Sequence, residues 1–322
     1  MSDPSVPSYL KVDYSLRPAK NIYRKLLRDH LQRLHFFSPL SDYQYIGFGS
    51  IYFTDFSLFH RSLGISRMTS IEANKTDVAR VCFNRPFSCI DIRMGRASEV
   101  LPSLDWSVPA IVWLDYDAPL SHEVLNDISV VCGRASKGSV LVVTVDGERK
   151  RLESPPADSD SPPDDWPSGI VARLERWIGR KHVPSGLRPP TLRANGLPDL
   201  YANVMFDHIR EQVSTRADGV TSHPFLQCLY SDGNKMVSVG VVFCGAEDAQ
   251  GLLGKGLFRW LETGANPMEI LPPKLTLREA AALSQMLPTE DPEGLEVPVP
   301  GADKAWMAKW YRYFPRFTET EL

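Results

Sequence analysis

The sequence predicts an α/β protein: a doubly wound sheet of five parallel strands that ends in an antiparallel hairpin. Three observations predict it. Short apolar segments alternate with helical patterns between residues 43 and 146. Each of these segments is followed by polar residues, as at the carboxyl ends of buried parallel strands. An Asp232-Gly233 turn between apolar runs at residues 225–230 and 236–243 predicts the hairpin.

Residues 43–72 contain the pattern that is most informative about a ligand. A strand around residues 45–46 leads into Gly47-Phe48-Gly49-Ser50, and a helix over 52–63 and a strand over 68–71 then lead to Glu72. Glycines let a ligand approach the backbone, and ligands of such sheets bind beyond the carboxyl ends of the strands. An acidic residue about 20 positions after the glycines suits two ribose hydroxyls. The stretch therefore predicts a nucleotide-like ligand, with a tight turn and a solvated Glu72 as the alternative.

Tyr52 narrows the kind of nucleotide. A dinucleotide-binding turn would carry a third glycine at this position. A bulky side chain there is unfavourable for the close passage of a pyrophosphate. S-adenosylmethionine has a ribose but no pyrophosphate, so the sequence favours it over a dinucleotide.

Three further strands are predicted at residues 88–92, 110–114 and 139–145. Polar residues follow each one: residues 95–98, then Asp115 and Asp117, then Asp146. Because the carboxyl ends of parallel strands meet at one edge of a sheet, we expect these residues and Glu72 to gather there. This convergence of unrelated loops predicts a functional site.

The chain has 322 residues, a net charge of −3 and five cysteines without a CxxC pair. No apolar run reaches the length of a membrane span, and the N-terminus lacks the apolar core of a signal peptide. These features predict a soluble cytoplasmic protein without membrane association. We divide the chain into a flexible N-terminus (1–14), a core domain (15–245) with a proline-rich insertion (146–200) that holds one helix at 170–178, and a helical or irregular C-terminal extension (246–322).

Two segments are basic. A predicted helix from Pro18 to about residue 34 carries Arg17, Lys20, Arg24, Lys25 and Arg28 on its polar side. This side is interpreted as a solvated face, or alternatively as an electropositive rim near the ligand. Interleaved aromatic and basic residues at 305–317 suit nucleic-acid binding, or packing of the tail on its own domain. The net charge makes nucleic acid the less favoured partner.

The order of these motifs resembles the class I S-adenosylmethionine-dependent methyltransferases, which have a Rossmann-like sheet. Residues 95–102 (GRASEVLP), followed by WLDYD at 113–117, are similar to a small-molecule O-methyltransferase pattern. The segments LRPAKNIYRKLL, YIGFGSIYFTDF, SIEAN, FNRPF and WLDYD resemble a bacterial family of predicted O-methyltransferases. That family is associated with mobile-element and phage-defence gene neighbourhoods.

The resemblance implies roles for particular residues. Gly47, Gly49 and Ser50 would hold the methionine portion of S-adenosylmethionine. Glu72 would accept hydrogen bonds from both ribose hydroxyls, and Ala97 and Ser98 would lie along the adenine. Asp115 would lie near the cofactor's amino group or a metal, and Asp115 and Asp117 are the catalytic candidates. The family's usual acid before Ala97 is replaced by Arg96, which is a departure at the adenine contact.

The resemblance leaves metal dependence and activity open. Mg²⁺-dependent O-methyltransferases have an Asp-Asn pair after the fifth strand, whereas Asp146 here precedes Gly147. No metal residues are predicted, and Mg²⁺ is not favoured. The acceptor is unknown, and a homo-oligomer or a defence-system partner is compatible with the sequence. The alternatives to a methyltransferase are a non-catalytic Rossmann-like sensor or complex subunit and a nucleic-acid-binding or modifying protein.

Overall fold

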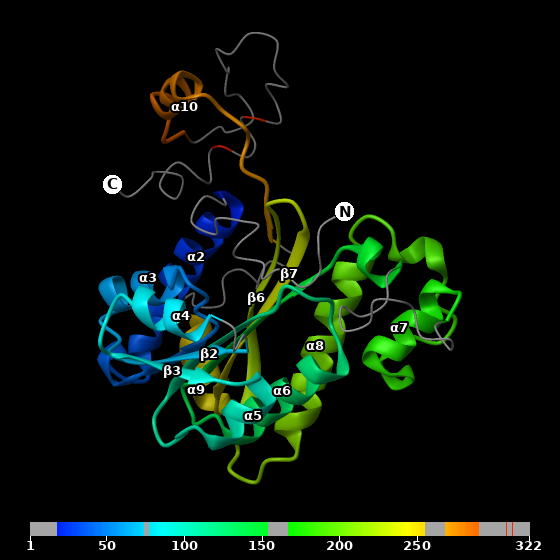
Figure 1. Cartoon of the computed structure of the whole chain (residues 1–322), viewed down its shortest axis with the longest axis horizontal. Coiled ribbons are helices and arrows are strands. Elements are labelled where there is room, and N and C mark those ends of the chain that lie inside the picture. The colour runs from blue at the N-terminus through cyan, green and yellow to red at the C-terminus, as the bar shows by residue number, and fades with distance from the viewer. Residues whose placement is uncertain are drawn as a thin grey trace.

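A sheet of eight strands forms the centre of the computed structural model (Figure 1). The structure describes residues 18–73, 77–153, 167–254 and 268–289, together with Met307 and Tyr311. The strands are β1 (Gln44–Gly47), β2 (Arg67–Glu72), β3 (Ile90–Met94), β4 (Ala110–Asp115), β5 (Val140–Asp146), β6 (Thr221–Ser231), β7 (Lys235–Cys244) and β8 (Met268–Ile270).

The strand order is β3-β2-β1-β4-β5-β7-β6-β8. Strands β1 to β5 are parallel to one another, and β7 pairs antiparallel with both β5 and β6. The predicted Rossmann-like sheet with a closing hairpin is therefore confirmed. The sequence analysis missed β8, which pairs parallel with β6. A three-residue strand is too short to show the alternation of apolar and polar residues by which strands are recognised.

Helices cover both faces of the sheet. The described helices are α2 (Pro18–Leu31), α3 (Thr54–Leu63), α4 (Val78–Asn84), α5 (Ala97–Val100), α6 (His122–Arg134), α7 (Ile170–Ile178), α8 (Gly196–Ser214), α9 (Ala246–Gly254) and α10 (Leu277–Ser284). One core cluster joins α2, α3, α4 and α9 to the sheet, and a second joins α5, α6, α7 and α8 to its other face (Figure 1). This is the doubly wound arrangement that right-handed crossovers predict.

The first helix differs from its predicted environment. Lys20, Arg24 and Lys25 are buried, with exposed fractions of 3%, 5% and 6%. The interpretation of this basic side as a solvated face is therefore wrong for these three residues. The apolar stripe of α2 packs on the sheet as expected, but the helix also lies close enough to the strand ends to bury the charged side.

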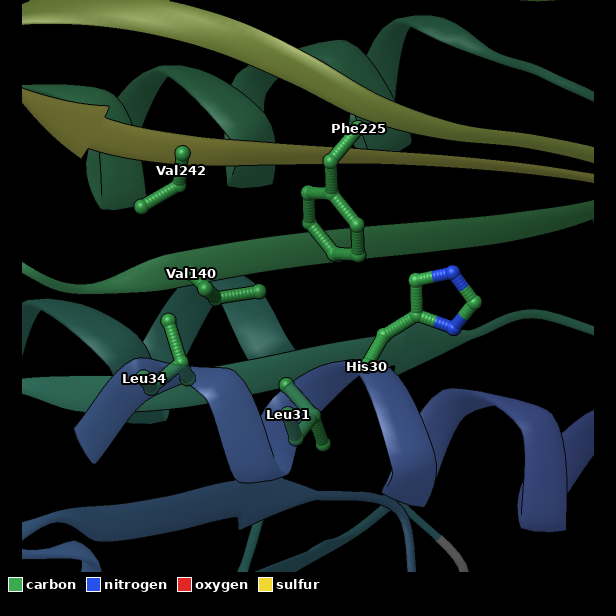
Figure 2. A pocket seen from close by; sticks show the side chains of 6 residues that line it. All are labelled: His30, Leu31, Leu34, Val140, Phe225 and Val242. Atoms are coloured by element: carbon green, nitrogen blue, oxygen red, sulfur yellow. The ribbon is translucent and has the colours of Figure 1, made fainter. Parts of the chain in front are cut away.

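A small apolar pocket lies between α2 and the sheet, as Figure 2 shows. It is lined by His30, Leu31, Leu34, Val140, Phe225 and Val242. Val140 is the first residue of β5, whereas Asp146 is the last. The pocket is therefore at the amino end of the parallel strands, opposite the edge where the predicted ligand residues gather.

The C-terminal region is described in part. Thr276 accepts a hydrogen bond from the backbone of Glu279 and caps α10. Tyr311 donates a hydrogen bond to the carbonyl of Ala280 at 3.0 Å, and Met307 packs against Leu283. The N-terminal 17 residues, the middle of the proline-rich insertion (154–166) and most of the tail at 305–317 lie outside the described residues. The division into domains stays a prediction.

Within the described ranges, none of the helices combines the length and the apolar character that crossing a membrane requires.

Candidate functional site

The glycine turn after β1 packs tightly on β2. A Cβ atom on Gly49 would lie 2.4 Å from Ser70 Oγ and 2.7 Å from the Phe53 ring, so this position requires glycine. The Gly49 N–H donates to Ser70 Oγ at 3.1 Å. Ser50 and Phe53 have left-handed φ angles of 48° and 46°. The turn delays the start of α3 to Thr54, two residues later than predicted.

Glu72 ends β2 beside this turn. Ser70 Oγ donates to Glu72 Oε1 at 3.4 Å. Burial raises the pKa of Glu72 to about 7, although hydrogen bonds from the backbone of Ser50, from Ser70 and from the backbone of Gly49 oppose the rise. Glu72 is thus a partly desolvated hydrogen-bonding group that changes its charge near neutral pH.

The turn after β3 is joined directly to the end of β2. The Gly95 N–H donates to the carbonyl of Glu72 at 2.9 Å. Gly95 has a φ of 153°, and a Cβ there would lie 2.9 Å from the Glu99 carboxylate. Ala97 is buried at the start of α5, and Ser98 is exposed beside it. The structure therefore brings the predicted adenine residues next to the predicted ribose residue.

Asp115, the last residue of β4, forms an ion pair with α2. Its Oδ2 lies 2.5 Å from Lys20 Nζ, and the two side chains are 17% and 4% exposed. Its Oδ1 is buried and accepts no hydrogen bond in the described part of the chain. Gly47 pairs with Trp113 in the sheet, which places Asp115 alongside the glycine turn. The Phe48 and Tyr116 rings, 5.1 Å apart, connect the two loops.

The β6–β7 turn fixes the position of Lys20. The backbone N–H groups of Ala19 and Lys20 donate to the two carboxylate oxygens of Asp232 at 3.0 and 2.7 Å. One turn along α2, the Tyr23 hydroxyl is 2.5 Å from Ser238 Oγ on β7. An aspartate at a helix N-terminus satisfies backbone donors and interacts favourably with the helix dipole. The hairpin therefore holds the first turn of α2 over the end of β4.

A second buried acid lies beneath the glycine turn. Tyr45 donates a hydrogen bond to the Asp55 carboxylate at the start of α3. Burial raises the pKa of Asp55, and the positive charge of Arg24 on α2 opposes the rise. The start of α3 is thus tied to β1 and faces the charged side of α2.

The two remaining strand-end aspartates differ from Asp115. Asp117 is exposed in the loop after β4. Asp146 is fully buried and accepts hydrogen bonds from the backbone of Glu148, from Arg151 and from Asn234. Among the described residues, no group of three His, Cys, Asp or Glu side chains is placed to hold a metal ion.

The sequence analysis named most of these residues but missed three. Gly47, Gly49, Ser50, Glu72, Ala97, Ser98 and Asp115 lie around the ends of β1 to β4, as expected. Lys20 and Asp232 were named only as parts of the first helix and of the hairpin turn, and Ser70 was not named; none of the three was predicted as a site residue. The basic side of the first helix, with its alternative interpretation as a rim near the ligand, was the signal for Lys20. A serine within an apolar strand was the signal for Ser70.

Comparison with known protein families gives one match, a family described as "Putative O-methyltransferase", over residues 12–322. The chain belongs to this family. The match covers nearly the whole chain, including the strand-end residues and the C-terminal region. A comparison with curated proteins found no match.

Solved methyltransferase structures resemble the chain weakly. An O-methyltransferase from Bacillus cereus with SAH is 14% identical over 73% of this chain and 86% of its own, with a TM-score of 0.38. Trm1 from Pyrococcus horikoshii, with S-adenosyl-L-methionine, is 11% identical over 71% and 58%, with a TM-score of 0.43. The chain spans 60% of the length of another match, a mutant of MtNAS. With such low TM-scores, the fold assignment depends on the sheet order described above.

Proposed function

We propose that this O-methyltransferase family member binds S-adenosylmethionine at the carboxyl ends of β1 to β4 and transfers its methyl group to an oxygen of an acceptor. The observation that carries the proposal is the contact between the glycine turn and the end of β2. Gly49 approaches Ser70 so closely that only glycine fits, and Ser70 and the turn both donate to Glu72. A turn without a Cβ beside a desolvated carboxylate suits a ribose and its attached chain.

Each strand end would contact a different part of the cofactor. Gly47, Gly49 and Ser50 would line the methionine portion, and the Glu72 carboxylate would accept hydrogen bonds from the ribose hydroxyls. Ala97 and Ser98 would lie along the adenine, because the Gly95 N–H joins their turn to the end of β2. Arg96 is exposed, and its guanidinium is 3.5 Å from the Glu123 carboxylate. The adenine contact at this position would therefore differ from the contact that the family's usual acid makes.

The chemistry requires positioning more than reactive groups. When bound, S-adenosylmethionine supplies an activated methyl group for in-line displacement by the acceptor oxygen. The chain must orient that oxygen and take its proton. Asp115 lies between α2 and the glycine turn, which suits a cofactor contact. Asp117 is exposed in the adjoining loop, which suits the acceptor side. We therefore assign Asp115 to the cofactor and Asp117 to proton transfer.

Calorimetric titration with S-adenosylmethionine and S-adenosylhomocysteine tests the proposal. We expect both to bind, and Glu72→Ala to weaken binding by more than about tenfold, because two charge-assisted hydrogen bonds are lost. Glu211→Ala, which removes an exposed carboxylate from α8, is the matched control and should leave the affinity unchanged. Absence of binding to the wild-type protein would disprove the proposal.

A non-catalytic sensor or complex subunit is the second candidate function. The observation that favours it is the ion pair that already occupies one oxygen of Asp115. Transfer of a labelled methyl group from S-adenosylmethionine to components of a bacterial extract, lost on Asp117→Ala, would exclude it. The acceptor, the oligomeric state, a defence-system partner and the cytoplasmic location stay predictions.

A further inference from the structure

Two segments of the proline-rich insertion are strongly basic. Residues 147–153 and 167–195 contain nine lysines and arginines against three glutamates, a net charge of +6, whereas the whole chain has a net charge of −3. Residues 154–166 between them hold four aspartates and lie outside the described residues. Five basic side chains of the two segments are exposed and form no ion pair with any residue that the structure describes: Lys150, Arg180, Lys181, Arg188 and Arg193. Unpaired like charges repel one another, so this basic surface favours an anionic partner.

The first basic segment adjoins the loop after β4. The backbone N–H of Asp146, at the end of β5, donates to the carbonyl of Ala118 at 3.0 Å. The short 3₁₀ helix Arg149–Glu153, which contains Lys150, follows β5 almost directly. Ala118 is next to Asp117, the residue that we assign to proton transfer. Lys150 therefore lies on the β5 side of the proposed acceptor loop.

The second basic segment reaches the other end of the same loop. The second core cluster joins α7, green in Figure 1, to α6 and α8. Where α7 ends, a Cβ atom on Gly179 would lie 2.8 Å from Cε1 of His122, the first residue of α6. Arg180 and Lys181 follow Gly179 directly. These two cations therefore lie beside the end of the loop that contains Asp117.

Arg193 lies on a third segment, just before α8. Its neighbour Ala194 accepts a hydrogen bond from Lys235 Nζ at 3.1 Å. The carbonyl of Lys235 in turn accepts from the Gly147 N–H at 2.7 Å, at the end of β5. The exposed cations thus come from three separate segments around one loop. An anion with a single phosphate would meet only part of this surface.

We propose that the basic surface binds the phosphate backbone of an RNA strand and presents a ribose 2′-hydroxyl to Asp117 as the methyl acceptor. The inference rests on the proposed function and names the acceptor class for it. A nucleic-acid strand carries a phosphate on every nucleotide, which matches cations spread over three segments. An O-methyltransferase also needs an acceptor oxygen, and the 2′-hydroxyl distinguishes RNA from DNA. The net charge of the whole chain conceals this local concentration of positive charge.

Methyl transfer to a ribose needs no protein group beyond those already assigned. The 2′-oxygen forms a bond to the methyl carbon while the carbon–sulfur bond breaks, and the bonding pair stays with the sulfur of S-adenosylhomocysteine. The hydroxyl proton passes to the Asp117 carboxylate. Phosphate contacts fix the position of a strand without reading its bases. The basic surface would therefore set which ribose reaches Asp117 but would not select a sequence.

Fluorescence anisotropy with the full chain and a fluorescein-labelled RNA tests the surface. The probe is a single strand of mixed sequence and about 20 nucleotides. We expect Arg180→Gln combined with Lys181→Gln to weaken RNA binding about tenfold or more at about 50 mM salt. The slope of log affinity against log salt should become shallower by about 1.4, because each phosphate contact on a single strand contributes about 0.7. The affinity for S-adenosylhomocysteine should stay the same, because the strand-end site is intact.

A matched double variant controls for the loss of charge alone. Arg134→Gln combined with Lys137→Gln also removes one exposed arginine and one exposed lysine. These residues lie between the end of α6 and the start of β5, at the opposite edge of the sheet. RNA affinity should change by less than about twofold. Equal losses in the two double variants, or no RNA binding by the wild-type protein, would overturn the inference.

Transfer of a labelled methyl group from S-adenosylmethionine to total bacterial RNA tests the acceptor atom. A 2′-O-methyl group blocks alkaline cleavage of the adjoining phosphodiester, so the label should remain in dinucleotides after alkaline hydrolysis. Single-stranded DNA should stay unlabelled. Label in mononucleotides or in DNA, or no label on RNA, would overturn the assignment of the 2′-hydroxyl. Failure of the wild-type protein to bind S-adenosylhomocysteine would instead refute the proposed function.

Discussion

The sheet edge at the carboxyl ends of the parallel strands has two halves. They differ in how far their carboxylates are hydrogen-bonded within the protein. In the ligand half, at β1 to β4, one buried oxygen of Asp115 accepts no hydrogen bond from the residues that the structure describes, and burial raises the pKa of Glu72 to about 7. In the anchoring half, at β5 and the β6–β7 hairpin, Asp146 accepts three hydrogen bonds at 2.8, 2.9 and 3.1 Å. Strand-end carboxylates that look alike in the sequence therefore have different uses.

The anchoring half ties loops to the sheet. The Gly147 N–H donates to the carbonyl of Lys235, and the Lys235 N–H donates to the Glu148 carboxylate. Lys235 Nζ donates to Asn195 Oδ1 at 2.8 Å just before α8. These bonds fasten the start of the proline-rich insertion and the start of α8 to the hairpin. Asp146, which already accepts three hydrogen bonds within the protein, is therefore a weaker candidate for a ligand contact than Glu72 or Asp115.

The largest expected effect is the loss of protein stability when Asp146, in the anchoring half, is replaced. Asp146→Ala should lower the free energy of unfolding by about 3 kcal/mol, because three donors lose a fully buried acceptor. Asp117→Ala, in the ligand half, should lower it by less than about 1 kcal/mol, because the Asp117 side chain is exposed. Urea denaturation measures both values. Similar losses for the two variants would remove the distinction between the halves.

The next effect concerns the glycine turn of the ligand half. Gly49→Ala should cost about 2 kcal/mol and weaken S-adenosylhomocysteine binding, because the new methyl group would displace Ser70 and Phe53. Gly133→Ala is the control, because a Cβ there meets no atom within 4 Å, and it should leave both quantities unchanged or raise stability slightly. Thermal denaturation and calorimetric titration provide the readouts. Normal stability and binding in Gly49→Ala would show that the turn adapts.

The third effect is a pH dependence that only the ligand half should show. Ribose hydroxyls donate to ionised Glu72, and its pKa of about 7 means that the carboxylate is mostly protonated at low pH. Affinity for S-adenosylhomocysteine should therefore fall about tenfold between about pH 8 and about pH 6. In Glu72→Gln, titrated over the same range, the dependence should be lost. A slope that survives in this variant would assign the titration to another group.

The same pKa shift affects stability with a defined sign. A carboxyl whose pKa is raised in the folded state favours folding when it is protonated. Its contribution is fully present below the ordinary pKa of 4.5 and is lost as the pH rises through about 7. The stability of the wild-type protein relative to Glu72→Gln should decline over that interval, which denaturation at several pH values can measure.

The smallest expected effect concerns the contact between the two halves, in which Asp232 of the β6–β7 hairpin caps α2. Asp232→Ala removes the hairpin carboxylate that caps α2 and should cost about 1 kcal/mol of stability. It should weaken S-adenosylhomocysteine binding less than Glu72→Ala does, because it loosens the first turn of α2 over Asp115 without removing a proposed cofactor contact. Asp207→Ala, which removes an exposed ion pair on α8, should change neither quantity. A loss of binding as large as that of Glu72→Ala would contradict this ranking.

Most of the fold could be predicted from the sequence because its signals are local. Apolar runs such as residues 110–114 indicate a fully buried strand wherever they occur, and α7 begins and ends at the predicted residues. The Asp232-Gly233 turn indicated its hairpin for the same reason. The three-residue β8 carries no such local signal, and α3 starts late because Phe53, its N-cap, has a left-handed conformation that apolar periodicity does not reveal.

The sequence by itself determined the sheet, the glycine turn and the set of polar residues at the strand ends. Periodicity reports which side of each element is buried, and the strand ends of a parallel sheet must meet at one edge. Only the tertiary structure decided which of these residues form hydrogen bonds or ion pairs within the protein. Lys20 meets Asp115, and Asp146 meets Arg151 and Asn234, because packing sets the distances between residues of different elements. Burial then fixes how much each polar contact matters, since unsatisfied groups cost most where water is absent.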